Sequence, residues 1–220
     1  MVKKEKKLKG AIFDLDGVLV DTVPLHFGAW KKMFGEYQKE FSFKNYKDKV
    51  NGIPRVDGAK AILRDLSEEK LKVAADKKQE YFLEFLEKEG VKVFEDVLNL
   101  IEELKNNHIK VAVISSSKNC PYILRRAGIE RLFDVIISGN DIERGKPEPD
   151  IFFVAAKKLN LTSSECIVFE DSFLGIEAAK KGRFRCIGVD RYRKPQHLIK
   201  ADLVVTTLRE VNLEKLEALL

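Results

Sequence analysis

Residues 11–17, with the sequence AIFDLDG, and residues 167–171, with the sequence IVFED, are two apolar, β-prone runs that each end directly in carboxylates. They lie far apart in the chain, but a parallel sheet would bring them together, because ligands of open α/β sheets gather at the carboxyl ends of the strands. Converging carboxylates repel one another unless a cation lies among them, and an oxygen-only ligand set suits Mg²⁺. The sequence therefore predicts metal-assisted chemistry on an anion.

Helical and strand patterns alternate from Val91 onward, after a first strand at Ala11–Phe13. Such alternation predicts a parallel sheet with helices on both faces, and hence an α/β fold with a doubly wound, Rossmann-like core. The predicted helices are Glu95–Asn106, Pro121–Ala127, Asp150–Leu159 and Leu174–Lys181, and the later strands are Val111–Ile114, Val135–Ile137, Ile167–Phe169, Cys186–Val189 and Leu203–Val205.

The stretch from Asp21 to Gly90 differs in kind, because it shows long helical periodicities and no convincing strand. We expect residues 1–20 and 91–220 to form the core domain and residues 21–90 to form an inserted all-helical cap domain. A helical unit that leaves the catalytic edge of the sheet can close on a ligand and exclude water.

Composition limits the class of protein. The 220 residues, 45% of them hydrophobic, suffice for one sizeable core and a smaller appended unit. The longest apolar stretches are too short to span a bilayer, and no signal-peptide core follows the first lysines, so we expect a cytoplasmic protein without a membrane partner. The three cysteines, Cys120, Cys166 and Cys186, lack C-x-x-C spacing and are expected to be inert buried thiols rather than disulfides or zinc ligands.

The formal net charge of +5 depends on one end of the chain, since five lysines lie within Val2–Lys9. We interpret this segment as a solvated terminus, with an electrostatic role as the alternative. A nucleic-acid partner would require a basic stripe interleaved with aromatic residues, and the rest of the sequence has none. We therefore expect no nucleic-acid partner.

Two carboxylates, Asp14 and Asp16, lie two residues apart directly after the first strand. They can divide the work of phosphoryl transfer, since one can attack phosphorus while the other handles the proton of the leaving or entering oxygen. Gly17 lets the chain turn at once. The alternative for this segment by itself is a strand that ends in a solvated acidic turn.

Two further segments carry groups that suit a phosphate. Residues 115–119, SSSKN, follow a β-branched strand, and hydroxyls with free N–H groups at a helix start form an anion cradle, although serines there are also plain N-caps. Lys146 stands in the proline-bracketed loop 145–149, where it is either solvated or neutralises a phosphate together with a nucleophile. Glu170 and Asp171 also fit as acidic residues at a helix N-terminus.

The chain resembles the haloacid dehalogenase superfamily in four motifs that follow one another in the same order. They are D-x-D-G-x-x-x-D-T at residues 14–22, a strand ending in Ser115, a lysine before a proline, and a strand ending in Glu-Asp. The resemblance covers essentially the whole chain. It implies that Asp14 is the nucleophile that becomes aspartyl-phosphate and that Asp16 is the general acid/base. It also implies that Ser115 and Lys146 bind the transferring phosphoryl group.

The same resemblance implies a Mg²⁺ cofactor. Asp14 and Asp171 would ligate the ion, Asp16 would contribute its backbone carbonyl, and Glu170 would support the ion directly or through water. The dehalogenase members lack this carboxylate set, so the motifs indicate phosphoryl transfer rather than dehalogenation.

The chain more closely resembles the β-phosphoglucomutase-like subfamily. The matching segments are Asp21-Thr22 with His26 four residues after Thr22, Gly52-Ile53-Pro54-Arg55, Lys77-Lys78, and Ser117-Lys118-Asn119. This resemblance implies that His26 acts on the proton transfer of Asp16, and that Arg55, Ser117 and Asn119 hold a distal phosphate. The implied substrate-binding residues are Thr22, His26, Arg55, Lys77, Lys78, Ser116, Ser117, Lys118 and Asn119.

Several alternatives stay open within this resemblance. His26 also fits as a packing histidine and Arg55 as a solvated cation, and the helix alignment leaves either Lys77 or Lys78 facing the site. Pro54 stands where the mutase usually has serine, and the amino-acid sequence of the cap is more similar to that of members described as hydrolases.

These residues predict a Mg²⁺-dependent enzyme, expected to be a monomer, that acts on a small phosphorylated metabolite. The favoured activity is that of a phosphatase for a sugar phosphate. The alternative is a mutase that interconverts β-glucose 1-phosphate and glucose 6-phosphate. A non-catalytic module that kept the fold would have lost Asp14 or Asp16, and both are present.

Overall fold

The computed structural model describes residues 8–193 and 198–220, so the lysine-rich segment Val2–Lys9 lies outside the described part except for its last two residues. A parallel sheet with the strand order β3-β2-β1-β4-β5-β6 forms its centre. The strands are β1 (Gly10–Asp14), β2 (Lys110–Ile114), β3 (Val135–Ile137), β4 (Cys166–Glu170), β5 (Arg185–Val189) and β6 (Leu203–Val205).

The strand order reverses between β1 and β4, which lie side by side in the middle of the sheet. Every residue of these two strands is buried, as expected for apolar runs covered on both faces. Phe13 and Phe169 are neighbours in register and stack with ring centroids 4.3 Å apart. The crevice of a doubly wound sheet lies at such a reversal, so the carboxylates that follow β1 and β4 share one edge.

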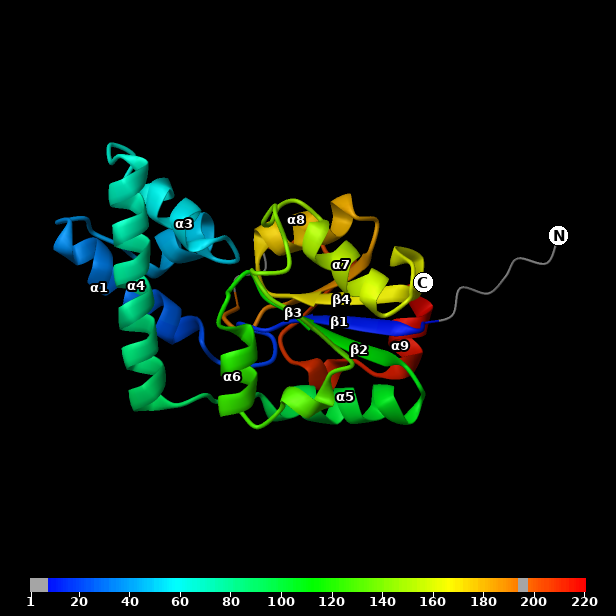
Figure 1. The fold of residues 1–220 in the computed structure, drawn as a ribbon. Helices are drawn as coiled ribbons and strands as arrows, with labels where there is room; N and C mark the ends of the chain where they lie inside the picture. Colours follow the sequence, from blue (N-terminus) through cyan, green and yellow to red (C-terminus); the bar gives the residue numbers. More distant parts are fainter. Residues whose placement is uncertain (1–7, 194–197) are drawn as a thin grey trace.

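Helices cover both faces of the sheet. In Figure 1, α7 (Asp150–Lys158) and α8 (Phe173–Lys181) lie on one face, and α5 (Glu95–Asn106), α6 (Cys120–Arg126) and α9 (Leu213–Ala218) lie on the other. The two faces carry separate hydrophobic clusters. Short 3-10 helices complete the connections at Glu130–Leu132, Ser163–Glu165 and Leu208–Glu210. The predicted α/β architecture is confirmed, with boundaries within about one residue of those expected.

The region between β1 and α5 is helical. Its elements are α1 (Val23–Glu36), α2 (Phe43–Asn45), the π-helix η1 (Tyr46–Val50), α3 (Arg55–Ile62) and α4 (Glu68–Glu89). Helices α1 and α4 pack side by side at the left of Figure 1, around a third hydrophobic cluster that includes Trp30, Phe34 and Leu71. We call residues 21–90 the cap below; their separation as a domain stays a prediction.

The turn after β1 is tight because Gly17 takes a φ of +84°, which favours glycine. A Cβ atom at this position would lie 2.7 Å from a carboxylate oxygen of Asp171. Gly17 therefore lets β1 turn directly against the end of β4. Within the described residues, no helix combines the length and apolar character needed to cross a membrane.

Candidate active site

Lys146 joins the two carboxylate runs at the edge of the sheet. Its ammonium group donates to Asp14 Oδ1 at 2.6 Å and to the carboxylate of Glu170, and only 1% of its side chain is exposed. Burial alone would lower the pKa of Lys146, but the charges of Asp14 and Glu170 raise it above its usual range. Lys146 is thus a fixed positive charge between β1 and β4.

Asp14 lies in surroundings that disfavour its negative charge more than Lys146 can offset. Burial raises the pKa of Asp14 and Lys146 lowers it, but the carboxylates of Glu170, Asp16 and Asp171 raise it again. The result is a pKa well above the usual range of an aspartate. Burial and the neighbouring carboxylates thus both disfavour the charged form of Asp14, and a further cation beside it would offset them.

Asp16 has different surroundings, although it lies two residues away. Thr22 donates to one of its oxygens, Ser115 Oγ donates to the other at 3.2 Å, and His26 Nε2 lies 3.3 Å from Oδ1. Burial would raise the pKa of Asp16, but His26 and these hydrogen bonds lower it to about 2. Thr22 is buried behind Asp16, so the structure places it as a support for Asp16 rather than against a ligand.

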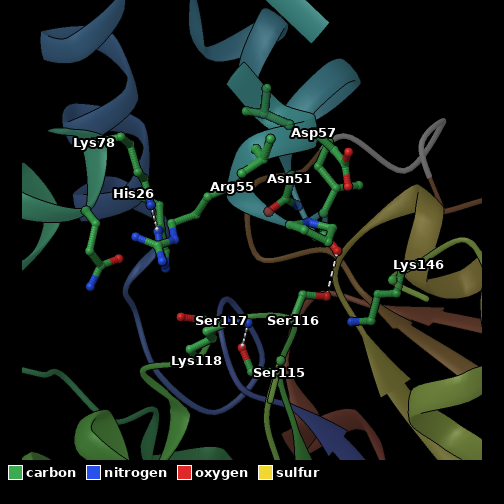
Figure 2. Close-up of a pocket in the computed structure, with 18 of the residues that line it drawn as sticks. His26, Asn51, Arg55, Asp57, Lys78, Ser115, Ser116, Ser117, Lys118 and Lys146 are labelled. Atoms are coloured by element: carbon green, nitrogen blue, oxygen red, sulfur yellow. Dashed lines mark hydrogen bonds between the residues drawn. The ribbon is translucent and has the colours of Figure 1, made fainter. Parts of the chain in front are cut away.

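His26 connects the cap to Asp16. Its ring stacks on Phe82 with centroids 4.0 Å apart, and its Nδ1 lies 2.8 Å from Lys78 Nζ (Figure 2). His26 therefore packs within the cap and also contacts Asp16, and its role in proton transfer stays a prediction. Burial, and after it the charge of Lys78, lowers the pKa of His26. A lysine that donates to Nδ1 leaves the Nε2 proton directed at Asp16.

The structure distinguishes the two candidate cap lysines. Lys78 is 2% exposed and lines the cavity, and burial lowers its pKa to about 7. Lys77 lies on the outer side of α4, where it pairs with Glu80 at 2.8 Å. Of the two lysines that the helix alignment left open, Lys78 therefore faces the cavity and Lys77 does not, because neighbouring residues of a helix point in different directions.

The serines after β2 form a hydrogen-bonded loop at the same edge. Ser115 Oγ accepts from the backbone N–H of Ser117, and Ser116 donates to the carbonyl of Gly52 in the cap at 2.9 Å (Figure 2). Ser115, Ser116, Ser117 and Lys118 line the cavity. The predicted anion cradle thus lies beside Asp16, and one of its serines fastens the cap to the core.

Asn119 is held by the cap instead of lining the cavity. Its amide exchanges two hydrogen bonds with the amide of Gln79 in α4, at 2.9 and 3.1 Å. A ligand of Asn119 would have to displace this pair. Gln79 was not predicted, since nothing in its local sequence distinguishes it from a solvated helix residue.

The cavity has a volume of about 930 Å³ and is lined by the sheet edge and the cap together. Arg55, at the start of α3, faces this cavity from the cap side, with 32% of its side chain exposed and Asp76 3.9 Å away. Figure 2 shows Arg55 and the serine loop on facing sides of it. The structure therefore brings Asp14, Asp16, Lys146, Arg55 and the serine loop to one space.

Two residues that the sequence did not reveal contact Asp171. Lys47 Nζ donates to Asp171 Oδ2 at 2.8 Å, and Asn51 Nδ2 donates to the same oxygen at 3.2 Å. They lie four residues apart and so share one side of a helical turn. That spacing was the available signal, but the neighbouring charged residues made the segment resemble solvated surface.

The comparisons with known proteins agree with this geometry. The family model described as "Haloacid dehalogenase-like hydrolase" matches residues 11–189, which include both carboxylate runs, the serine loop and Lys146. The chain belongs to this family. The resemblance stated from the motifs is thus confirmed, and two β-phosphoglucomutases among the similar proteins confirm the β-phosphoglucomutase-like subfamily as well.

Similar members of this haloacid dehalogenase-like family include two curated proteins. A β-phosphoglucomutase of Bacillus subtilis is 33% identical over 95% of this chain and 94% of its own length. A "Phosphorylated carbohydrates phosphatase" of Thermotoga maritima is 30% identical over 93% of this chain and 100% of its own length. A crystal structure of β-phosphoglucomutase from Clostridium difficile superposes with a TM-score of 0.87, at 29% identity over 96% of both chains. The chain is therefore an enzyme of the haloacid dehalogenase-like phosphatase and phosphoglucomutase kind.

The family implies a Mg²⁺ ion, and the donor chemistry of the site fits one. Asp14, Asp171 and Glu170 supply the carboxylate oxygens that Mg²⁺ prefers, and burial together with the neighbouring carboxylates raises the pKa of Asp14, which a cation beside it would lower. Within residues 8–193 and 198–220, however, no three His, Cys, Asp or Glu side chains are arranged so that they could hold one metal ion. Lys146 and Lys47 take up the carboxylate oxygens instead, so the predicted metal ligands stay a prediction.

Proposed function

We propose that this enzyme is a Mg²⁺-dependent phosphatase of small sugar phosphates that works through an aspartyl-phosphate on Asp14. The observation that carries the proposal is the contrast between Asp14 and Asp16. The first is paired with Lys146 at the mouth of the sheet crevice, and the second is held by Thr22, His26 and Ser115. Two neighbouring carboxylates with such different partners are suited to separate roles, one in attack on phosphorus and the other in proton transfer.

In the proposed first step, a carboxylate oxygen of Asp14 attacks phosphorus and the bond to the sugar oxygen breaks. The sugar oxygen takes a proton from Asp16, which the negative phosphoryl group beside it keeps protonated during the step. Lys146 and Ser115 offset the charge on the phosphoryl oxygens.

In the second step, water attacks the same phosphorus, Asp16 takes its proton, and Asp14 and inorganic phosphate are released. Asp16 thus ends each cycle with the proton that it gave up. A bound metal ion would be held by Asp14, Asp171 and the carbonyl of Asp16, with Glu170 in support, and it would supply positive charge to the phosphoryl oxygens.

Three observations support a sugar phosphate as substrate. The relatives from Bacillus subtilis and Thermotoga maritima are named for phosphorylated sugars or carbohydrates. The cavity of about 930 Å³ exceeds what a phosphate alone would fill. Its walls carry Arg55, Ser117 and Lys118, which suit the hydroxyls and charges of such a molecule.

A mutase is the second candidate, and the position of Arg55 favours it. Arg55 and the serine loop face each other across the cavity, so a bisphosphorylated sugar could place one phosphate at Asp14 and the other between them. In that case a sugar hydroxyl, rather than water, accepts the phosphoryl group from Asp14.

The test is phosphate release from a panel of hexose and pentose phosphates, with and without Mg²⁺. We expect turnover that EDTA removes and Mg²⁺ restores, and that Asp14→Asn abolishes while its circular dichroism stays that of the wild type. Full activity of Asp14→Asn, or activity that is indifferent to EDTA, would overturn the proposed mechanism.

The panel also tests the class of substrate. Sugar phosphates should be preferred over p-nitrophenyl phosphate, and Arg55→Ala should reduce that preference while sparing the small substrate. An Arg55→Ala variant that leaves every substrate unaffected would remove the distal site from both candidate functions.

A further inference from the structure

Lys47 is a cap lysine buried against the core. Its side chain is 7% exposed, and its ammonium group donates to Asp171 twice, to Oδ2 at 2.8 Å and to the backbone carbonyl at 3.3 Å. Within the described residues, Asp171 is the one carboxylate that pairs with Lys47. The lysine therefore depends on Asp171 for its counter-charge.

The surroundings of Lys47 connect this pair to the junction of cap and core. The Lys47 ammonium lies 5.6 Å from the ring centroid of Tyr192, in the loop after β5. Tyr192 packs against Phe43 of the cap, and its hydroxyl donates to Asp21, where the cap begins, at 3.0 Å. Lys47 thus seats the segment from α2 to η1 against the core.

A metal ion at Asp171 would use the same negative charge. Asp171 Oδ2 already accepts from Lys47 and Asn51, and a buried lysine without a counter-ion is strongly disfavoured. Two cations that share one carboxylate in a poorly solvated site weaken each other's binding. Such coupling is reciprocal. The free energy by which Lys47 weakens metal binding therefore equals the free energy by which the metal weakens the contact of Lys47 with the core.

We propose that Lys47 is a cap-borne cation that competes with the metal ion for Asp171, so that metal loading loosens the cap until an anionic substrate binds. The phosphate of the substrate then supplies the negative charge that lets the metal and Lys47 occupy the site together. The inference rests on the Mg²⁺ site of the proposed function, and it adds an order of events: metal first, then substrate, then closure.

Calorimetric titration of the substrate-free protein with MgCl₂ tests the competition. Lys47→Met should bind Mg²⁺ about tenfold more tightly than the wild type, because the competing charge is gone. Lys49→Met is the matched control, since Lys49 lies two residues away on the same helix but is exposed; its affinity should stay within about twofold of the wild type, because exposed charges are screened. Lys47→Gln provides a second neutral variant if Lys47→Met does not fold.

The position of the cap is tested with Trp30, which is the single tryptophan and lies buried at the cavity in α1. MgCl₂ should increase the quenching of Trp30 fluorescence by acrylamide in the wild type, and inorganic phosphate should reverse the increase. In Lys47→Met, MgCl₂ should change the quenching little, because the contact is already absent.

The outcomes separate this inference from the proposed function. If the wild type binds no Mg²⁺, or if Asp171→Asn binds it as well as the wild type, the metal site itself is wrong. If Asp171→Asn abolishes binding but Lys47→Met binds Mg²⁺ no more tightly than Lys49→Met does, the competition is refuted and the metal site stands. If Lys47→Met binds Mg²⁺ more tightly but MgCl₂ does not change the acrylamide quenching of Trp30 in the wild type, the proposed effect of the metal on the cap is refuted.

Discussion

At the scale of single residues, the pKa values of Asp14 and Asp16 differ mainly because their partners differ. Asp14 is buried and Asp16 is partly buried; Asp14 faces other carboxylates, whereas Asp16 receives hydrogen bonds from Thr22 and Ser115 and lies beside His26. The pKa is accordingly raised at Asp14 and lowered to about 2 at Asp16. One chain segment of three residues thereby presents two carboxylates in different surroundings, and the proposed reaction gives them separate roles: attack on phosphorus for Asp14 and proton transfer for Asp16.

Lys146 should contribute to the reaction more than to folding. In Lys146→Ala we expect kcat/KM to fall on the order of a hundredfold or more, because the positive charge beside the phosphoryl group is lost. The fold should persist, since the raised pKa of Asp14 lets the cluster take up a proton in place of the ammonium. Steady-state kinetics with circular dichroism measures both. Lys157→Ala, at an exposed position of α7, is the control, and a loss under about threefold in Lys146→Ala would remove Lys146 from the reaction.

Lys78 should make the stability of the protein depend on pH. Its pKa is lowered from 10.5 to about 7 in the folded chain, so between these values the unfolded chain binds a proton that the folded chain does not. The free energy of unfolding should therefore rise with pH over this window, by up to about 1.4 kcal/mol per pH unit from this group.

Urea unfolding of the wild type and of Lys78→Met at pH 7.5 and pH 9.5 measures this effect. The difference between the two proteins cancels the titration of the other groups. From pH 7.5 to pH 9.5, we expect the free energy of unfolding of the wild type to rise by about 2 kcal/mol relative to that of Lys78→Met. A difference that does not change with pH would mean that Lys78 titrates normally.

At the scale of elements, the loops that follow the strands could be predicted because their signals are local. Asp14, Ser115 and Asp171 each follow an apolar run, and parallel strands place such positions at one edge whatever the details of packing. The π-helix Tyr46–Val50 could not be predicted in this way, because its turn departs from the usual helical period. Lys47 lies in this turn and Asn51 directly after it, among charged residues that resemble solvated surface, and both were missed although they contact a predicted metal ligand.

Gly17 and Gly90 allow the turn after β1 to be tested against a matched position. Both have positive φ, at 84° and 77°, but a Cβ at Gly17 would meet Asp171, whereas a Cβ at Gly90 would meet nothing within 4 Å. Gly90→Ala should cost about 1–3 kcal/mol of stability through backbone strain alone, because its φ of 77° and ψ of −168° lie in a region that is essentially confined to glycine. Gly17→Ala should cost more than Gly90→Ala, because Asp171 must also move.

The two glycine variants should also differ in activity. Gly17→Ala should lower kcat, since Asp171 is displaced, and Gly90→Ala should not. Urea unfolding and steady-state kinetics measure the two effects. Equal losses of stability in the two variants would show that Asp171 does not constrain the turn.

At the scale of the whole molecule, the cap residues could be predicted as a group but not one by one. The sequence could not decide between Lys77 and Lys78, because only the packing of α4 against α1 and the core fixes which side of the helix is buried. The sequence also predicted that Asn119 binds the substrate, whereas in the structure its side-chain amide is hydrogen-bonded to the amide of Gln79 in the cap. The positions of residues at the sheet edge can be predicted from the topology of the sheet. The positions of cap residues depend instead on how the cap packs against the core.

The way in which the cap meets the core also bears on the choice between phosphatase and mutase. A mutase must hold a second phosphate firmly while the phosphoryl group waits on Asp14, and Arg55 with the serine loop offers such a grip. Asn119, however, is engaged with Gln79, so a second phosphate would have to break two hydrogen bonds to reach it. We therefore expect water to be the main acceptor of the phosphoryl group.

³¹P NMR distinguishes the two outcomes in a single experiment. With β-glucose 1-phosphate, catalytic glucose 1,6-bisphosphate and Mg²⁺, inorganic phosphate should grow faster than glucose 6-phosphate. Gln79→Ala should shift the balance toward glucose 6-phosphate, since it frees Asn119 for the distal phosphate, whereas an exposed cap substitution such as Lys49→Ala should not. If the wild type itself forms mainly glucose 6-phosphate, the protein is a mutase and the pairing of Asn119 with Gln79 yields to the substrate.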